Sequence, residues 1–175
     1  KATVTAFFRS HLERKADILM FRPMRRSNQA LSADETVRIL ERNTSGTLAL
    51  QGDNGYPYAV PLSYVYCGGK IFFHSAKAGH KIDAVQADER ASFCVIDQDD
   101  VVPEKLTTYY RSVIVFGRVR LLENPDEIYS ALRLLGDRYA TPFRERTEAE
   151  VARDINRTAI IELTIEQMTG KEAIE

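Results

Sequence analysis

Residues 46–76, GTLALQGDNGYPYAVPLSYVYCGGKIFFHSA, decide the fold. Three runs rich in β-branched and aromatic residues are separated by DNG at 53–55 and by CGGK at 67–70. Both separators suit tight turns, because glycine and asparagine adopt positive φ at low cost. The stretch therefore predicts three consecutive antiparallel strands, a β-meander.

The second run, YPYAVPLSYVY, carries two prolines. Pro57 and Pro61 have no backbone N–H, so the strand should lie at a sheet edge or face a gap at those points. Alternation predicts one face made of Tyr58, Val60, Leu62, Tyr64 and Tyr66, and a second made of Ala59, Pro61, Ser63 and Val65. Either the second face is only partly covered by the protein, or a bound group fills the gap.

The rest of the chain adds strands and a few helices. A capping box, SADE at 32–35, predicts a helix that begins at Ser32. The acidic stretch 97–108 has no period and is predicted to be a loop, and Gly117 should mark a bend or bulge. The other predicted elements are helices at 80–88, from Pro125 and near 148–155, and strands at 90–97, 109–123 and 158–170.

Six strands joined mostly by hairpins predict a mainly β fold, an antiparallel barrel with peripheral helices at its openings. A parallel α/β sheet would need strands and helices to alternate along the chain, and they do not. We expect residues 25–175 to form this one domain. Residues 1–24, with apolar side chains at helical spacing, should form a helical extension.

Composition excludes several classes of function. The net charge is −1 and no long basic run occurs, which argues against a nucleic-acid partner. No apolar run reaches the roughly 20 residues of a membrane span. The two cysteines are too few for a disulfide framework, so a cytoplasmic protein is expected. His74 and His80 have no third ligand at a suitable spacing, so no metal site is expected.

The stretch 72–83, FFHSAKAGHKID, gathers hydrogen-bond donors where a strand ends and a helix begins. The free N–H groups and positive end of the helix, with the Lys81 ammonium, suit a phosphate. Ser75, Lys77 and His80 would add donors and charge. The alternative is that these polar side chains are only a solvated turn.

The succession of DNGYPYAVPLSYVY, GGKIFFHSAKAGHKIDAV, RASFCVID and YYRSVIVFGRVRLLE resembles the FMN-binding split-barrel flavoproteins related to pyridoxamine 5'-phosphate oxidase. Within them it is most similar to the branch of 5-nitroimidazole-resistance (nitroimidazole reductase) proteins. The resemblance runs from about Arg25 to Gly170. It implies a six-stranded split barrel, FMN as cofactor, and a homodimer with the flavin sites at its interface.

The resemblance also implies site residues. Pro61, Leu62 and Ser63 would lie beside the flavin ring, largely through backbone contacts, which would explain the prolines. His74 and Ser75 would flank the ribityl and phosphate side, and His80 and Lys81 would hold the phosphate. From the neighbouring subunit, Arg111 and Ser112 would reach the flavin.

Two departures from the oxidases affect the expected substrate. The strand YPYAVPLSY has no early basic residue, and the chain has no tryptophan with which to form the oxidases' Trp- and Arg-bearing tail. Vitamin B6 oxidation is therefore not expected. The expectation is an FMN oxidoreductase that passes electrons from NAD(P)H to a small oxidant such as a nitroaromatic, with His74 as the catalytic group, because an imidazole can donate a proton near neutral pH.

Alternatives remain open at this point. His74 is equally well explained as a structural histidine. The same barrel also resembles deazaflavin (F420)-dependent reductases, which would need a wide basic groove. A non-catalytic protein that binds flavin or haem is the third alternative, with His74 or His11 as an axial haem ligand.

Overall fold

The computed structural model describes residues 21–140 and 157–174, together with 148, 149, 151, 153 and 155. Most of the expected extension 1–24, including His11, and part of the expected helix near 148–155 lie outside these residues. No helix of the described residues is both long enough and apolar enough to cross a membrane.

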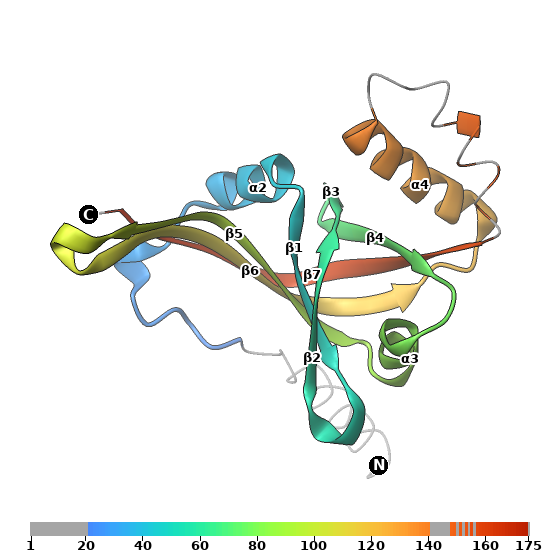
Figure 1. Ribbon diagram of the computed structural model, residues 1–175, viewed down its shortest axis with the longest axis horizontal. Helices are drawn as coiled ribbons and strands as arrows, with labels where there is room; N and C mark the ends of the chain where they lie inside the picture. Colours follow the sequence, from blue (N-terminus) through green and yellow to red (C-terminus); the bar gives the residue numbers. More distant parts are fainter. Residues whose placement is uncertain are drawn as a thin grey trace, which may run out of the picture.

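In the described part of the chain, one sheet is surrounded by helices α2, α3 and α4 (Figure 1). The helices are α2 (Ala33–Arg42), α3 (His80–Ala87) and α4 (Pro125–Tyr139). The strands are β1 (Ser45–Gln51), β2 (Pro57–Ser63), β3 (Val65–Cys67), β4 (Lys70–Ala76), β5 (Arg90–Val102), β6 (Thr107–Leu121) and β7 (Thr158–Ala173). Short 3-10 turns are η1 (Ser27–Gln29), η2 (Asp53–Gly55) and η3 (Pro103–Lys105).

The described strands form a single antiparallel sheet in the order β2-β1-β5-β6-β7-β4-β3. The sheet is not closed, since β2 and β3 at its two ends do not pair. The predicted mainly β fold with peripheral helices is confirmed. The prediction of six strands is wrong: the sheet has seven, because YPYAVPLSYVY forms two short strands.

The prediction of a meander is also wrong, because the chain passes from one edge of the sheet to the other at Tyr64. β2 pairs with β1 and β3 pairs with β4, at opposite ends of the sheet. Between them Tyr64 is fully buried, and its hydroxyl donates to the Leu40 carbonyl of α2 at 2.8 Å. Its backbone is held by the Tyr139 hydroxyl of α4, 2.5 Å from the Tyr64 carbonyl and 3.0 Å from its N–H. Two helices thus fix the point at which the chain leaves one edge for the other.

We expect Tyr139→Phe to lower the free energy of unfolding by about 1–2 kcal/mol, because the carbonyls of Thr44 and Tyr64 lose a shared donor. Urea unfolding measures the change. Tyr129→Phe is the matched control, since Tyr129 lies on the same helix and is about equally exposed but does not bond to Thr44 or Tyr64. Equal stability of the two variants would contradict the clamping role of Tyr139.

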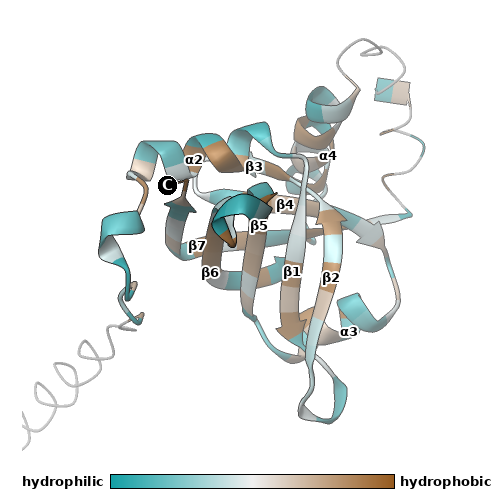
Figure 2. Cartoon of the chain, turned by 60° about the vertical axis from the view of Figure 1, so that its left-hand side comes forward, coloured by the Kyte–Doolittle hydropathy of each residue, from teal (hydrophilic) through white to brown (hydrophobic). Residues whose placement is uncertain are grey.

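The core lies inside the curved sheet, between its strands and helices α2 and α3. Phe93 is central to it, with its ring edge-on to Tyr64 at 4.9 Å and to Phe73 at 5.1 Å between centroids. A smaller cluster lies under α4 around Phe72 and Leu135. Figure 2 shows hydrophobic residues gathered on the strands, whereas the β1–β2 turn is hydrophilic.

The predicted loop at 97–108 is instead a two-stranded arm (Figure 1). β5 and β6 remain paired as far as Val102 and Thr107. Polar side chains on both faces of the arm hide the alternation that marks a strand with one buried face. Two local predictions are confirmed: Ser32 accepts a hydrogen bond from the Glu35 N–H at 3.1 Å, and the β6–β7 register shifts at Gly117.

Candidate functional site

The outward edge of β2 carries backbone groups with no strand to bond. At its two ends, the Gly52 N–H donates to the Tyr56 carbonyl at 2.9 Å and the Tyr64 N–H to the Thr44 carbonyl at 3.3 Å. The register between these bonds is regular, so even-numbered residues of β2 bond to β1 and odd-numbered ones face away. Pro57 and Pro61 are odd-numbered, which is why they are tolerated.

It follows that Ala59 and Ser63 present free N–H groups along this edge, and residues 57, 59, 61 and 63 present carbonyls. No other strand of the described part of the chain pairs with this edge. The predicted edge position of the prolines is therefore confirmed. The predicted face alternation holds within β2: Tyr58, Val60 and Leu62 are half-buried, while Ala59, Pro61 and Ser63 are exposed. It fails beyond Ser63, because Val65, predicted on the exposed face, is buried in β3.

The N-terminus of α3 is a second set of free donors. Gly79 precedes the helix with φ +119°, a conformation that other residues rarely adopt, and no side chain caps the first turn. The N–H groups of His80 and Lys81 therefore have no acceptor within the helix. The positive end of the helix dipole adds to the attraction for an anion at this point.

Lys81 is a half-buried cation at this terminus. Burial lowers the pKa of its ammonium group, so an anion beside it would restore the stability of the charged form. Within the described residues Lys81 forms no ion pair. Lys81 is therefore the candidate cation for an anion bound at the start of α3.

His80 connects the two sets of donors. Its ring stacks on Tyr58 of β2, with ring centroids 4.0 Å apart and an interplanar angle of 25°. Its Nε2 lies 3.6 Å from an Asp53 carboxylate oxygen in η2. The structure thus brings the beginning of β2 beside the start of α3. That Pro61, Leu62 and Ser63, farther along β2, share a site with His80 and Lys81 stays a prediction.

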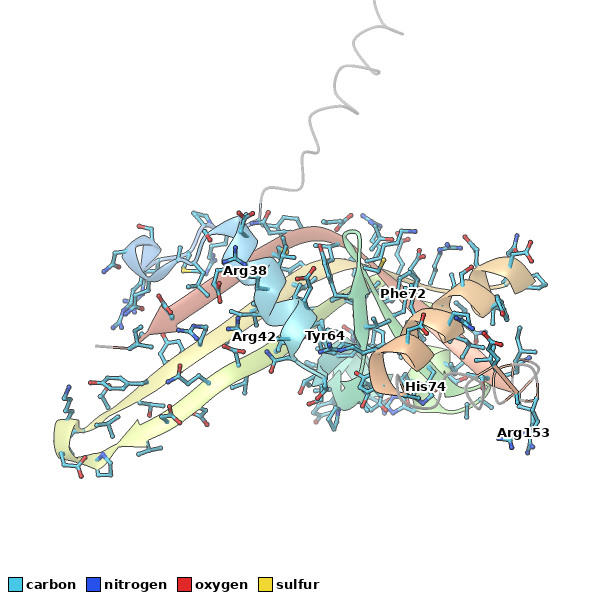
Figure 3. The ribbon with its side chains drawn as sticks, turned by 90° about the horizontal axis from the view of Figure 1, so that it is seen from above. Arg38, Arg42, Tyr64, Phe72, His74 and Arg153 are labelled. Atoms are coloured by element: carbon cyan, nitrogen blue, oxygen red, sulfur yellow. The ribbon has the colours of Figure 1, made fainter. Side chains whose placement is uncertain are left out.

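His74 and Ser75 lie on β4, opposite Ile160 and Ala159 of β7. His74 is exposed and shares a strand face with Phe72, which packs under α4 (Figure 3). Ser75 is half-buried and faces the other way. Both stand just before the loop 77–79 that leads to His80, so the sequence alone keeps them near the α3 terminus.

Arg111 and Ser112 lie on β6, farther along the sheet. Ser112 is opposite Ile96, on the outer face of the sheet. Arg111 faces the other way, and its guanidinium lies 3.0 Å from Glu172 and 3.4 Å from Asp97. Contact of either residue with a cofactor of a second subunit stays a prediction.

Asp97 is the centre of an ion-pair network that sequence reasoning missed. It sits where the β5–β6 register shifts, which turns its side chain toward α2. It accepts hydrogen bonds from Arg42 at 2.5 and 2.7 Å and from Asn43 at 2.7 Å. The Arg42 bonds, with help from Asn43 and Arg111, lower the pKa of Asp97 to about 2.

Asp97 should make stability depend on pH at the acidic end. Its folded-state pKa is below its ordinary value of 3.8, so its contribution is complete well above pH 4 and is lost as the pH falls through about 2. We expect Asp97→Asn to cost about 2 kcal/mol at pH 7 and progressively less as the pH falls toward and below 2. Urea unfolding at several pH values tests this, with the exposed Asp99→Asn as control. A constant difference across that range would rule out the linkage.

Other groups of polar side chains in the described residues are weaker candidates for a functional site. No three His, Cys, Asp or Glu side chains among the described residues are placed to hold a metal ion. Tyr58 and Asp53 were missed as partners of His80, and no local pattern could have found them, because β2 and α3 meet only in the folded chain.

A family model for pyridoxamine 5'-phosphate oxidase matches residues 32–172. The chain belongs to the pyridoxamine 5'-phosphate oxidase family. The resemblance drawn from the motifs is therefore confirmed. A search of the curated proteins found no match.

Solved structures agree with this family in fold. A protein of Bacteroides thetaiotaomicron assigned to 5-nitroimidazole antibiotic resistance is 19% identical, with a TM-score of 0.66 over 82% of this chain and 86% of that one. The flavocytochrome Anf3 of Azotobacter vinelandii is 23% identical, with a TM-score of 0.75 over 88% and 73%. An FAD-binding protein of Mesorhizobium loti is 27% identical, with a TM-score of 0.55 over 82% and 96%.

Proposed function

We propose that this member of the family binds FMN and transfers electrons from NAD(P)H to a small oxidant such as a nitroaromatic compound. One observation carries the proposal: β2, whose outer edge is unpaired, contacts the uncapped start of α3 through the stacked rings of Tyr58 and His80, and Lys81 there has no counterion among the described residues. Support comes from the family match and from similar structures described as flavin-binding or as nitroimidazole-resistance proteins.

The edge of β2 fits the polar side of a flavin ring. In the pyrimidine part of the ring, one N–H lies between two carbonyls. On this edge the Ser63 N–H lies between the carbonyls of Pro61 and Ser63, so it would donate to one ring carbonyl while a neighbouring backbone carbonyl accepts from the ring N–H. Backbone contacts of this kind need no particular side chain, so Pro61 and Ser63 would hold the ring through their backbone. Leu62, whose backbone bonds to β1, would only keep these two residues in place.

The start of α3 fits the phosphate. A dianion there would accept bonds from the N–H groups of His80 and Lys81 and would pair with the Lys81 ammonium. It would also relieve the cost of burying that ammonium without an ion pair. Ser75 and Lys77, at the end of β4 and in the following loop, would add a hydroxyl and a second charge.

A bound flavin would supply the two-electron redox chemistry, and the protein would supply binding, orientation and proton transfer. His74 is exposed, on the face of β4 that it shares with Phe72. We assign it the role of proton donor to the reduced product. The nicotinamide donor and the nitroaromatic acceptor would approach the ring from its open side.

The same proposal includes a homodimer. Ile96, Ile114 and Phe116 share the outer face of the sheet with Ser112, and they are 64%, 42% and 40% exposed. Large apolar side chains grouped on one sheet face are typical of an interface. If a second copy of the chain covered this face, Ser112 would lie within the interface.

Ile96→Lys tests the dimer. A charge at the most exposed of the three apolar positions would have to be buried without a partner, so we expect association to weaken at least tenfold. Sedimentation velocity over a range of concentrations measures it, and Val101→Lys, on the arm, is the control. A wild-type chain that sediments as a monomer at every concentration would contradict the dimer.

The absorption spectrum tests the cofactor. We expect the purified protein to show flavin bands, or to acquire them with FMN, and to bleach on anaerobic addition of NADH or NADPH. Mass spectrometry of the released cofactor separates FMN from FAD. A protein that binds no flavin would overturn the proposal, and a Soret band in place of the flavin bands would point to haem.

A further inference from the structure

We infer that Tyr58 is a positioning residue that holds the His80 imidazole at the phosphate end of the cofactor. The inference rests on the proposed function, since it concerns how the flavin phosphate is recognised. It adds a side chain whose role neither the motifs nor the family match indicates. It also explains why an aromatic residue stands on the inner face of an edge strand at this position.

The geometry indicates that the Tyr58 ring acts as a platform on which the His80 ring is held. Tyr58 is half-buried and packs against the main core, so its ring is held by the sheet. The His80 side chain is 42% exposed and would otherwise sample several rotamers at the start of α3. The stacked contact, 4.0 Å between ring centroids, selects one of them. Tyr58 thereby fixes an exposed imidazole beside Lys81.

The charges around His80 define what this rotamer does. Lys77 precedes it and Lys81 follows it in the chain, and an Asp53 carboxylate oxygen lies 3.6 Å from its Nε2. Asp83 follows in the first turn of α3. Because His80 is the first residue of α3, its imidazole is held at the helix terminus that carries the free N–H groups. A phosphate at that terminus would contact an imidazole already in place.

Preorganisation of this kind should affect only ligands that carry the phosphate. A side chain fixed before binding loses no rotamer freedom when the ligand arrives, and this raises affinity without any new contact. Riboflavin has the same ring as FMN but no phosphate. The ratio of the two dissociation constants therefore reports on His80 and Lys81, whereas the affinity for riboflavin reports on the edge of β2.

The experiment compares FMN and riboflavin binding by flavin fluorescence in wild type, Tyr58→Leu, Tyr58→Phe and His80→Ala. For Tyr58→Leu we expect FMN affinity to fall roughly fivefold to tenfold, riboflavin affinity to stay within about twofold, and Tyr58→Phe, which keeps the ring, to behave as wild type. His80→Ala should show the same loss. Combined with Tyr58→Leu it should add nothing, because the platform acts only through the imidazole.

Three results would overturn the inference. A His80→Ala variant with unchanged FMN affinity would show that the imidazole has no role, whether or not Tyr58→Leu folds. Equal losses for FMN and riboflavin in Tyr58→Leu would show a structural effect on β2. Additive losses in the double variant would show that the two residues act separately. A wild-type protein that binds neither ligand would instead refute the proposed function itself.

Discussion

Lys81→Met is expected to weaken FMN binding by roughly 10- to 100-fold, the largest effect of any single side chain on the cofactor. The range follows from the net contribution of a hydrogen bond to a charged group, which is about 1.5–3 kcal/mol. Methionine preserves the unbranched apolar stem, which is half-buried, so the change removes the charge and little packing. Titration of the apoprotein with FMN, followed by fluorescence, measures the loss.

Two controls, riboflavin as a second ligand and Lys105 as a distant lysine, show whether the loss is specific to the phosphate. Riboflavin affinity should not change in Lys81→Met, because the ring would be held by β2. Lys105→Met, which removes the same charge from the exposed tip of the arm, should leave both affinities unaltered. Loss of FMN and riboflavin binding together would mean that Lys81 supports α3 and does not contact the phosphate.

The edge of β2 illustrates what the sequence was able to predict. The spacing of Pro57 and Pro61 was enough to place the strand at an edge, because a missing N–H has the same consequence in any fold. The end of that strand was not predictable in the same way. Tyr64 continues the alternation of YPYAVPLSYVY without interruption. The contacts that fix the change of partners there come from Leu40 of α2 and from Tyr139, 75 residues later in the chain.

The candidate site, too, could be predicted only where it depends on local sequence. The motif at 72–83 placed donors and a cation at the start of α3 because a strand end, a glycine and a helix start are local features. The contact of His80 with Tyr58 and the network around Asp97 depend on how distant segments meet. The 97–108 arm was missed for another reason: an arm exposed on both faces has no hydrophobic period to detect.

Phe93→Ala is expected to reduce the free energy of unfolding by about 3–5 kcal/mol, a large part of the stability of a domain of this size. The Phe93 side chain is fully buried and touches the two aromatic rings that fill the centre of the sheet. Phe116→Ala on the neighbouring strand is the control, because Phe116 lies on the outer face and is 40% exposed. Urea unfolding at two protein concentrations separates folding from association.

Gly46 gives a second way to test the same packing. A Cβ atom at Gly46 would lie 2.4 Å from the tip of the Phe93 ring and 2.6 Å from the Cys94 carbonyl oxygen, so β1 approaches β5 this closely only because residue 46 has no side chain. Gly46→Ala should therefore destabilise the wild type. In the Phe93→Ala background its cost should be smaller, because the clash with the ring is gone, but not zero, because the clash with the Cys94 carbonyl remains. Identical costs in the two backgrounds would show that the ring does not limit the approach of the two strands.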